Sequence, residues 1–139
     1  MTDLGAGGII LPAYTDGPVD SFATTLHFSY PRAPLTSNQR LHWAHKAKIT
    51  RNVRDATRML AHRIPELGKC RVTLTWFVKT TTRRDADNIV PTLKAMCDGL
   101  VDAGVVPDDT PAEMEKLMPV IKYEKGAIPH MELRIEMIS

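Results

Sequence analysis

Alternating apolar and polar positions predict four strands in this chain. Residues 22–30 place aromatic and aliphatic side chains on one side, and residues 72–78 and 131–138 alternate in the same way. A fourth, weaker strand is expected at residues 117–123, where Pro119 interrupts the pattern. The strands are therefore spread along the chain rather than grouped at one end.

Two other segments have a helical period. The first, residues 46–63, carries its apolar residues on one face and its basic residues on the opposite face. The second begins at Asn88 or at Pro91 and runs to Ala103, just before Gly104. Between this helix and the next strand, residues 105–116 predict a turn with at most a short helical turn.

The order of these elements is strand, helix, strand, helix, strand, strand. This order predicts an α+β domain in which a mixed β-sheet carries two main helices on one face. Residues 1–20 are rich in Gly and Pro and have no clear period, which predicts a flexible N-terminal extension. The remaining residues, 21–139, are expected to form one domain.

Composition narrows the class of protein. Apolar residues make up 43% of the chain and charged residues 24%, which is typical of a globular domain. The formal net charge of +2 does not by itself indicate a nucleic-acid partner. The two cysteines, Cys70 and Cys97, lack metal-site spacing, and neither a signal peptide nor a membrane span is visible. We therefore expect a soluble cytoplasmic protein with two reduced thiols and no membrane partner.

Acidic residues gather in two pairs. The stretch RRDADN puts Asp85 and Asp87 one residue apart after the second strand, and Asp108 and Asp109 follow the second helix. Converging carboxylates suit Mg²⁺, which prefers oxygen ligands. From Gly104, five extended residues span about 17 Å, which is enough to bring the second pair back alongside the start of the helix. Alternatively, the partner subunit of a two-fold dimer could supply the second pair. Each pair taken alone is also compatible with a plain surface turn.

The second helix has one polar face. If it begins at Asn88, Lys94 and Asp98 share a stripe with Asp87; if Pro91 begins it, with Val90 outside the helix, only Lys94 and Asp98 remain. Asp98 would lie about 16 Å from Asp87 along the axis, too far to share one ion. It is expected either to pair with Lys94, four residues earlier, or to be solvated.

The run RRDADNIVPTLKAMCDGLVDAGVVPDD resembles the signature of RusA-type Holliday-junction resolvases. That family combines an acid-x-acid-Asn motif, a lysine at the start of a helix, an aspartate four residues on, an Ala-Gly helix end and an Asp-Asp pair. The corresponding positions here are Asp85, Asp87, Asn88, Lys94, Asp98, Ala103, Gly104, Asp108 and Asp109. One spacing differs, since the family's lysine follows the second acid by four residues, where this chain has Pro91. The likeness extends over residues 21–138.

The resemblance implies a small homodimeric endodeoxyribonuclease that depends on Mg²⁺, with Mn²⁺ able to substitute. Such an enzyme resolves four-way DNA junctions by symmetric paired nicks during recombination and repair, and relatives are common in phages and prophages. The resemblance assigns catalytic roles to Asp85, Asp87, Asp109 and Lys94. It assigns metal binding to the same three acids, with help from Asp108.

A junction nuclease needs cations and polar groups that hold DNA phosphates. Candidates lie just before the acids, on the loop after the first strand and on the exposed face of the first helix: Lys79, Arg83, Arg84, Asn38, Arg40, Arg51, Arg54 and Arg58. The helix face is equally compatible with a solvated basic surface. The cations next to the acids are therefore the stronger candidates.

Three other functions stay open. The displaced lysine would suit a junction- or DNA-binding protein that has lost catalysis. A nuclease that prefers flaps or other branched DNA would carry the same residues. The third is a metal-dependent enzyme that does not act on nucleic acid. Its D-x-D motif would hold the metal of a nucleotide-sugar, although 139 residues leave little room for such a fold.

Overall fold

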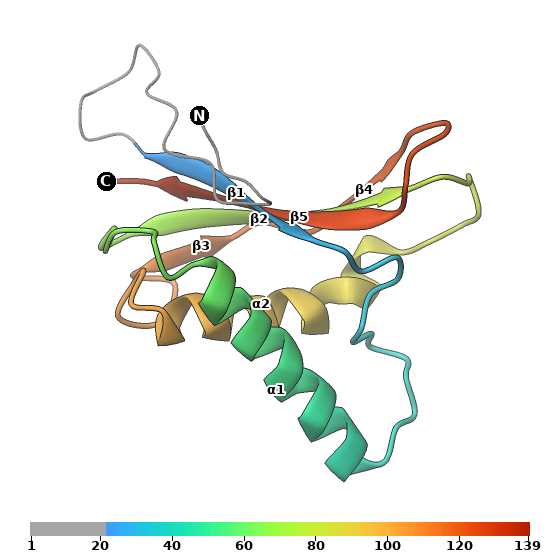
Figure 1. Cartoon of the computed structure of the whole chain (residues 1–139), viewed down its shortest axis with the longest axis horizontal. Helices are drawn as coiled ribbons and strands as arrows, with labels where there is room; N and C mark the ends of the chain where they lie inside the picture. Colours follow the sequence, from blue (N-terminus) through green and yellow to red (C-terminus); the bar gives the residue numbers. More distant parts are fainter. Residues whose placement is uncertain (1–21) are drawn as a thin grey trace.

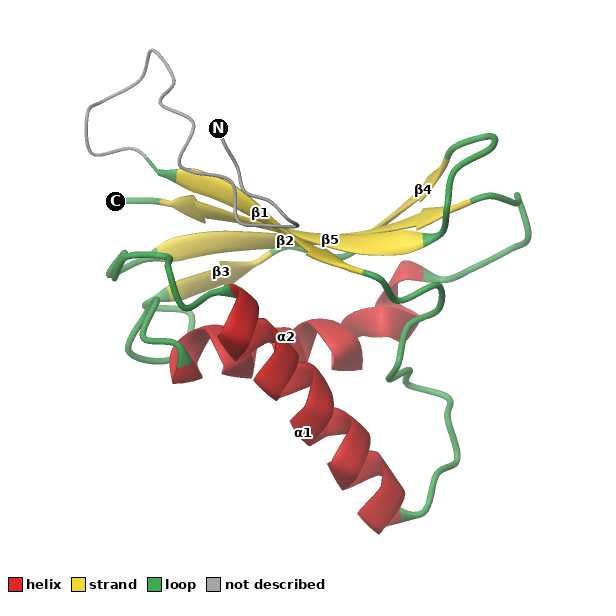
Figure 2. Cartoon of the chain, viewed as in Figure 1, coloured by secondary structure: helices red, strands yellow, loops and turns green. Residues whose placement is uncertain are grey.

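A computed structural model describes residues 22–139 of the chain. Its fold is α+β: a five-stranded mixed sheet carries both main helices on one face (Figures 1 and 2). The fold class predicted from the sequence is confirmed. The predicted N-terminal extension, residues 1–20, lies outside the described residues.

The sheet is built around the last strand and the second one. Strand β5 (His130–Met137) pairs antiparallel with both β1 (Ala23–Phe28) and β2 (Cys70–Val78). Strands β3 (Met114–Lys116) and β4 (Val120–Tyr123) pair in succession with β2, both parallel. The spatial order is therefore β1, β5, β2 and then β3, with β4 continuing along β2.

The alternation read from the sequence matches the burial of the three longer strands. Leu26 in β1 lies opposite Leu133 in β5, and Leu133 lies opposite Leu74 in β2. All three side chains are buried and face the helices, where they form the centre of one hydrophobic core. The polar residues between them face the other side of the sheet, which leaves that face free of helices (Figure 1).

The predicted strand at residues 117–123 is wrong in its extent. The chain forms two short strands there, and β3 occupies residues that were expected to make a turn. Pro119 has no N–H for a ladder hydrogen bond, so the pairing with β2 is broken at that point. Strand β3 was missed because three residues, of which only Met114 is buried, are too few to reveal an alternating pattern.

Helix α1 (Trp43–Leu60) begins three residues earlier than predicted and ends three residues earlier. The imidazole of His42 accepts a hydrogen bond from the backbone N–H of Ala44, 3.2 Å away, and so caps the first turn. The predicted apolar face does turn toward the core, with Val53 fully buried on it.

Helix α2 (Val90–Asp102) follows a 3₁₀ turn, η1 (Ala86–Ile89), without a break. Its start lies between the two positions that the sequence left open. Val90 keeps helical backbone angles although Pro91 follows it, so the expectation that Pro91 excludes Val90 from the helix is wrong. Because Asp87 lies in η1, the polar stripe on α2 itself consists of Lys94 and Asp98.

The two helices cross in close contact at Gly99. A Cβ atom at this position would lie 2.5 Å from the backbone oxygen of Arg54 and 2.7 Å from Cβ of Thr57, so the crossing needs glycine. This contact fixes α2, and with it the acids at both ends, against α1. Neither helix in the described part of the chain has the length and apolar character needed to cross a membrane.

Candidate metal and nucleic-acid site

The loop after β2 carries the two arginines into the acidic turn. The guanidinium of Arg84 donates hydrogen bonds to the backbone oxygens of Thr80 and Thr82, at 3.1 and 2.8 Å, and to the Thr80 hydroxyl. It also lies over the ring of Trp76, 5.2 Å from its centre. Arg84 therefore holds the loop in shape, and the chain reaches Asp85 in an extended conformation.

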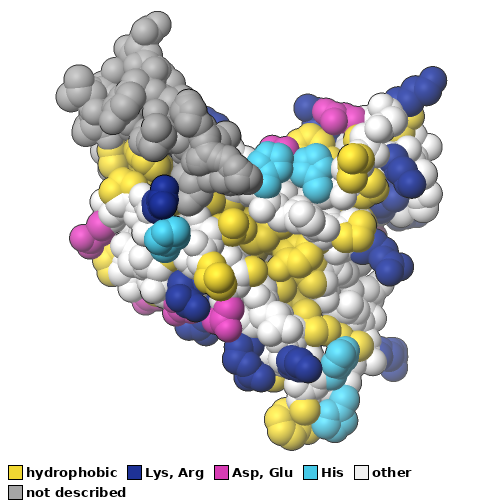
Figure 3. Space-filling model, in the orientation of Figure 1, with side chains coloured by type: hydrophobic (Ala, Val, Ile, Leu, Met, Phe, Trp, Pro, Cys, Tyr) yellow, Lys and Arg dark blue, Asp and Glu magenta, His cyan; other side chains and the backbone are white. Residues whose placement is uncertain are grey.

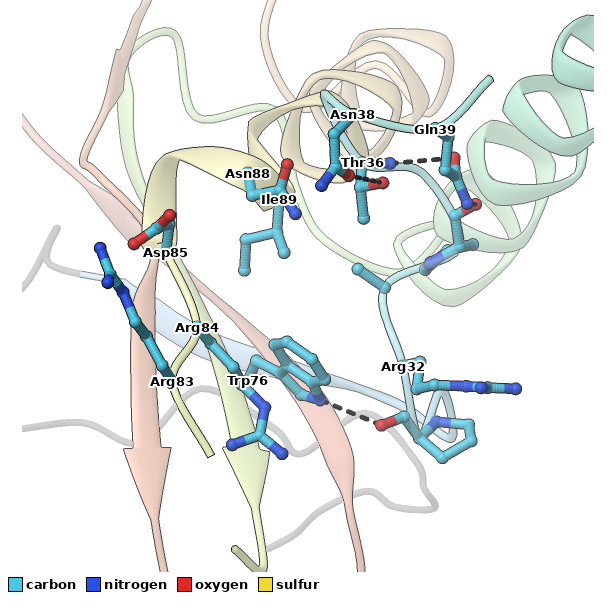
Figure 4. A pocket seen from close by; sticks show the side chains of 13 residues that line it. Arg32, Thr36, Asn38, Gln39, Trp76, Arg83, Arg84, Asp85, Asn88 and Ile89 are labelled. Carbon is cyan, nitrogen blue, oxygen red and sulfur yellow. Dashed lines mark hydrogen bonds between the residues drawn. The ribbon is translucent and has the colours of Figure 1, made fainter. Parts of the chain in front are cut away.

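Asp85 lies on the wall of a cleft of about 750 Å³, which we call the Trp76 cleft (Figure 4). Cations lie around it on two segments, because Arg32 comes from the loop after β1, whereas Arg83 and Arg84 come from the loop after β2. The remaining walls are formed by Trp76 and by polar and small residues: Thr36, Asn38, Gln39, Asn88, Ile89, Pro31, Ala33 and Pro34. The cleft is thus polar, cationic and lined by one large aromatic ring.

The loop that forms the outer wall of the Trp76 cleft is tied to α2 and η1. Buried Thr92 accepts a hydrogen bond from the N–H of Leu35 at 3.1 Å and donates one to its oxygen at 2.7 Å. Ser37 N–H donates to the backbone oxygen of Asn88 at 2.9 Å. On the inner side, the indole N–H of Trp76 donates to the oxygen of Pro31 at 3.1 Å. These bonds keep the two walls at a fixed separation.

The carboxylates of Asp85 and Asp87 are both exposed. Within residues 22–139 neither carboxylate has a hydrogen-bond or ion-pair partner. Asp85 lines the Trp76 cleft and Asp87 does not, although only one residue separates them. Two anionic groups without partners are available to a ligand that supplies positive charge.

A second group of charges lies alongside α2. The ammonium of Lys94 is 2.8 Å from a carboxylate oxygen of Asp98 and 2.8 Å from Oδ2 of Asp109. Lys116, in β3, is 3.0 Å from the same Oδ2. We call Lys94, Asp98, Asp109 and Lys116 the Lys94 network. Of the two expectations for Asp98, the ion pair with Lys94 is the one found. The chain after Gly104 does run back, but it brings Asp109 to Lys94 within the helix rather than to the helix start.

The electrostatics of the Lys94 network follow from these contacts. The hydrogen bonds from Lys94 and then Lys116 hold the pKa of Asp109 well below its usual range. The hydrogen bonds to Asp109 and Asp98 in turn raise the pKa of Lys94 above its usual value. At neutral pH Asp109 is therefore ionised and Lys94 is protonated.

The acids predicted to bind metal are not all gathered in one place. Within the described residues, no three of Asp85, Asp87, Asp108 and Asp109 bring ligand atoms within 4.8 Å of one another. Asp108 accepts a hydrogen bond from the N–H of Asp109 at 2.8 Å and so shapes the turn. The donor atoms nevertheless suit Mg²⁺, which commonly binds through one or two carboxylates and completes its shell with waters and substrate oxygens.

The structure separates the predicted DNA-binding residues into groups. Three of them line the Trp76 cleft: Asn38, Arg83 and Arg84. Arg51 and Arg54 line a groove of about 590 Å³ on α1, beside Trp43 and Lys46. The others are exposed and line neither the cleft nor the groove: Lys79, Arg40 and Arg58. Figure 3 shows Lys and Arg side chains scattered over this face of the molecule, several of them in its lower part.

Arg54 is not a free cation, because its guanidinium makes two hydrogen bonds to the carboxylate of Asp102 on α2, one of them 2.8 Å long. This contact joins the two helices next to Gly99. A role for Arg54 in packing is therefore visible in the structure, while its predicted role toward DNA stays a prediction.

Sequence reasoning missed several residues of these two regions. Lys116 follows Asp109 by seven residues and was read as part of a turn, because β3 was not recognised. Arg32 and Trp76 come close to Asp85 only through the pairing of strands and the anchored loop. The charge of Arg32 was the one available signal, and nothing in its spacing connects it with the acids.

No family model matches this chain, and no curated protein matches its sequence. The resemblance to the junction resolvases therefore stands on the motif residues alone.

Proposed function

We propose that this protein is a Mg²⁺-dependent endonuclease that cuts branched DNA, with the four-way junction as its preferred substrate. The observation that carries the proposal is the position of Asp109, held by Lys94 and Lys116 alongside α2. The turn just before that helix carries Asp85 and Asp87. All four proposed catalytic residues thus belong to α2 or to the segments that adjoin it.

Asp85 and Asp87 are the residues that would hold Mg²⁺, since their carboxylates have no other partner among the described residues. When bound, the metal would activate a water molecule and balance the charge of the phosphodiester. Asp108 and Asp109 lie in the loop after α2, with Asp109 beside Lys94, and would extend the ligand set if the side chains or the DNA drew them closer.

Lys94 would stabilise the negative charge that develops on the phosphate. Its ammonium is held by two carboxylates and stays charged at neutral pH, which suits a group that must stabilise negative charge on a phosphate. Lys94 also borders a small pocket together with Lys116, so both ammonium groups can be approached from outside. Although Lys94 stands three residues later than the family pattern requires, it reaches Asp109.

The Trp76 cleft would hold the DNA backbone next to the metal. Arg32 and Arg83 are exposed on its rim, and cations around a cleft attract phosphates at long range. A homodimer would place two such sites on the two equivalent strands of a junction. We also propose a cytoplasmic location, which suits the two free, buried thiols, Cys70 and Cys97.

The proposal is tested by incubating the untagged protein with a synthetic four-way junction, a flap and a linear duplex, with Mg²⁺ and with EDTA. Asp87→Asn is assayed beside the wild type, and Glu66→Gln serves as the matched control, since Glu66 is an exposed acid on the loop after α1 and is not among the proposed site residues. We expect paired symmetric nicks on the junction with Mg²⁺, abolished by EDTA and by Asp87→Asn and unchanged by Glu66→Gln. Absence of both binding and cleavage would overturn the nucleic-acid proposal.

One observation favours a second candidate, a junction-binding protein without nuclease activity. Asp109 is already neutralised by two lysines, and the acids are not gathered around one ion position. Tight junction binding without any nick, in Mg²⁺ or Mn²⁺, would support this candidate. Nicks confined to the flap would instead identify a nuclease for other branched DNA.

A further inference from the structure

Two histidines and a glutamate meet on the sheet face that carries no helices. Glu132 and His130 are two residues apart in β5, so their side chains leave the same face of the sheet. His27, in β1, is the cross-strand partner of Glu132. Pairing of the first and last strands therefore brings together side chains that are about a hundred residues apart in the sequence.

The ligand atoms of these three residues all lie within 4.8 Å of one another. The Nε2 atom of His130 is hydrogen-bonded to Oε2 of Glu132 at 2.9 Å, and the Nε2 atom of His27 is 3.6 Å from the same oxygen. A bound metal ion would replace the proton of that hydrogen bond. Neighbouring ligands on a tetrahedral Zn²⁺ with bonds near 2.1 Å are about 3.4 Å apart. The three ligand atoms are thus near enough for small side-chain movements to bring them to that spacing.

The ring of His130 is already oriented for a ligand. Its Nδ1 lies 2.8 Å from the backbone oxygen of Ile128, and because a carbonyl can only accept, Nδ1 must carry a hydrogen. A backbone carbonyl bound to one ring nitrogen is the usual support of a metal-bound histidine, because it fixes the other nitrogen as the ligand. Phe77 stacks on the same ring at 4.6 Å and limits its rotation.

We propose that His27, His130 and Glu132 form a binding site for Zn²⁺ or a similar divalent transition metal. Two imidazoles and one carboxylate are a donor set that suits Zn²⁺, whereas Mg²⁺ prefers oxygen ligands alone. The site is separate from the acids around α2 and does not depend on the proposed nuclease activity. Figure 3 shows a pair of histidine side chains side by side on the upper part of the surface.

Binding needs one local movement. The rings of His27 and His130 are stacked, 5.5 Å between centres and 12° apart in plane, so their Nε2 lone pairs do not yet converge. The side chain of His27 is half exposed and can turn toward the ion without disturbing the core. The bound ion would then connect β1, at one edge of the sheet, to β5 in its interior.

The proposal is tested by titrating the full, untagged chain with Zn²⁺ in a calorimeter and by measuring the melting temperature with and without the ion. We expect one Zn²⁺ per chain and a higher melting temperature in its presence. His130→Ala and Glu132→Gln should each weaken binding at least about tenfold, since even residues outside the ligand set cost this much. Thermal unfolding of both variants without metal establishes that they are folded.

Two controls place the ion. His45→Ala removes an exposed histidine from the start of α1, where His42 and Trp43 also lie, and should leave the Zn²⁺ affinity unchanged. Glu66→Gln removes an exposed acid that belongs to neither proposed site and should also have no effect. Loss of binding in either control, equal binding by wild type and His130→Ala, or no binding by the wild type would overturn the proposal.

Discussion

The two acidic regions along α2 differ in how their charges are satisfied. Asp109 accepts hydrogen bonds from two lysines, and its side chain is only 16% exposed. The carboxylates of Asp85 and Asp87, at the turn before the helix, are exposed and have no such partner within the described residues. The negative charge of Asp109 is therefore balanced by lysines of the same chain, whereas the charges of Asp85 and Asp87 are not balanced by a direct partner.

The two regions are therefore expected to contribute differently to stability and to cation binding. Ion pairs that are partly shielded from water stabilise the fold and fix the position of their members. Unpaired carboxylates contribute little to stability and are free to bind a cation. We therefore expect substitutions in the Lys94 network to change both stability and activity, and substitutions at Asp85 and Asp87 to change activity alone.

The largest expected effect is that of Asp87→Asn on cleavage. Loss of a proposed metal ligand removes several kcal/mol of transition-state stabilisation, which lowers the rate by about a thousandfold. Because the side chain is exposed and unpaired, the free energy of unfolding should change by less than about 0.5 kcal/mol. Single-turnover cleavage of a four-way junction and urea denaturation measure the two quantities.

A folded Asp87→Asn protein that cuts the junction at the wild-type rate would show that Asp87 is no metal ligand. The same two measurements on Asp85→Asn tell whether Asp85, which lines the Trp76 cleft, or Asp87 contributes more to cleavage. A large loss of stability in either variant would contradict the view that this region is unpaired.

A strand can be predicted from this sequence only where it is long enough to show alternating apolar and polar residues. Strands β1, β2 and β5 are long enough for alternation to reveal which side chains, such as Leu26 and Leu133, enter the core. Strand β3 has three residues, so no period can be recognised in it. Its place beside β2 depends on long-range pairing, which a local pattern does not contain.

The candidate site was predictable where its contacts are local. Lys94 and Asp98 are four residues apart on one helix, and their ion pair was predicted from that spacing. The return of Asp109 to the helix was one of two outcomes that chain length allowed. The contacts of Lys116 and the approach of Arg32 to Asp85 depend on strand order, which is why the sequence did not indicate them.

The next largest effect is expected from Asp109→Asn, which removes a charge shared by two lysines. Hydrogen bonds to charged groups contribute about 1.5–3 kcal/mol, but Lys94 is more than half exposed, so we expect a loss near 1–2 kcal/mol. Cleavage should fall as well, since Lys94 loses one of its two anchors. Glu115→Gln breaks an exposed pair with Arg71 and is the matched control, with an expected change under about 0.5 kcal/mol.

The same comparison predicts a dependence on pH. The pKa of Asp109 is lowered by folding, so its contribution to stability is fully present above the unfolded-state value near 4 and is lost as the pH falls through the folded-state value. The difference in unfolding free energy between wild type and Asp109→Asn should therefore be constant from about pH 5 to 8 and shrink below pH 4. Urea denaturation across this range measures it, and a difference that grows on acidification would contradict the assignment.

The smallest expected effect is on the salt dependence of DNA binding, and it is measured by substituting one arginine without a partner and one arginine in an ion pair. Arg83 is exposed on the Trp76 cleft, whereas Arg54 is bound to Asp102. If Arg83 contacts a phosphate, Arg83→Gln should lower the slope of log binding constant against log salt by about 1 and leave stability unchanged. Arg54→Gln should leave the slope unchanged and cost about 0.5–1 kcal/mol of stability. The opposite pattern would mean that pairing within the free chain does not tell which cations bind DNA, because a phosphate can displace Asp102 from Arg54.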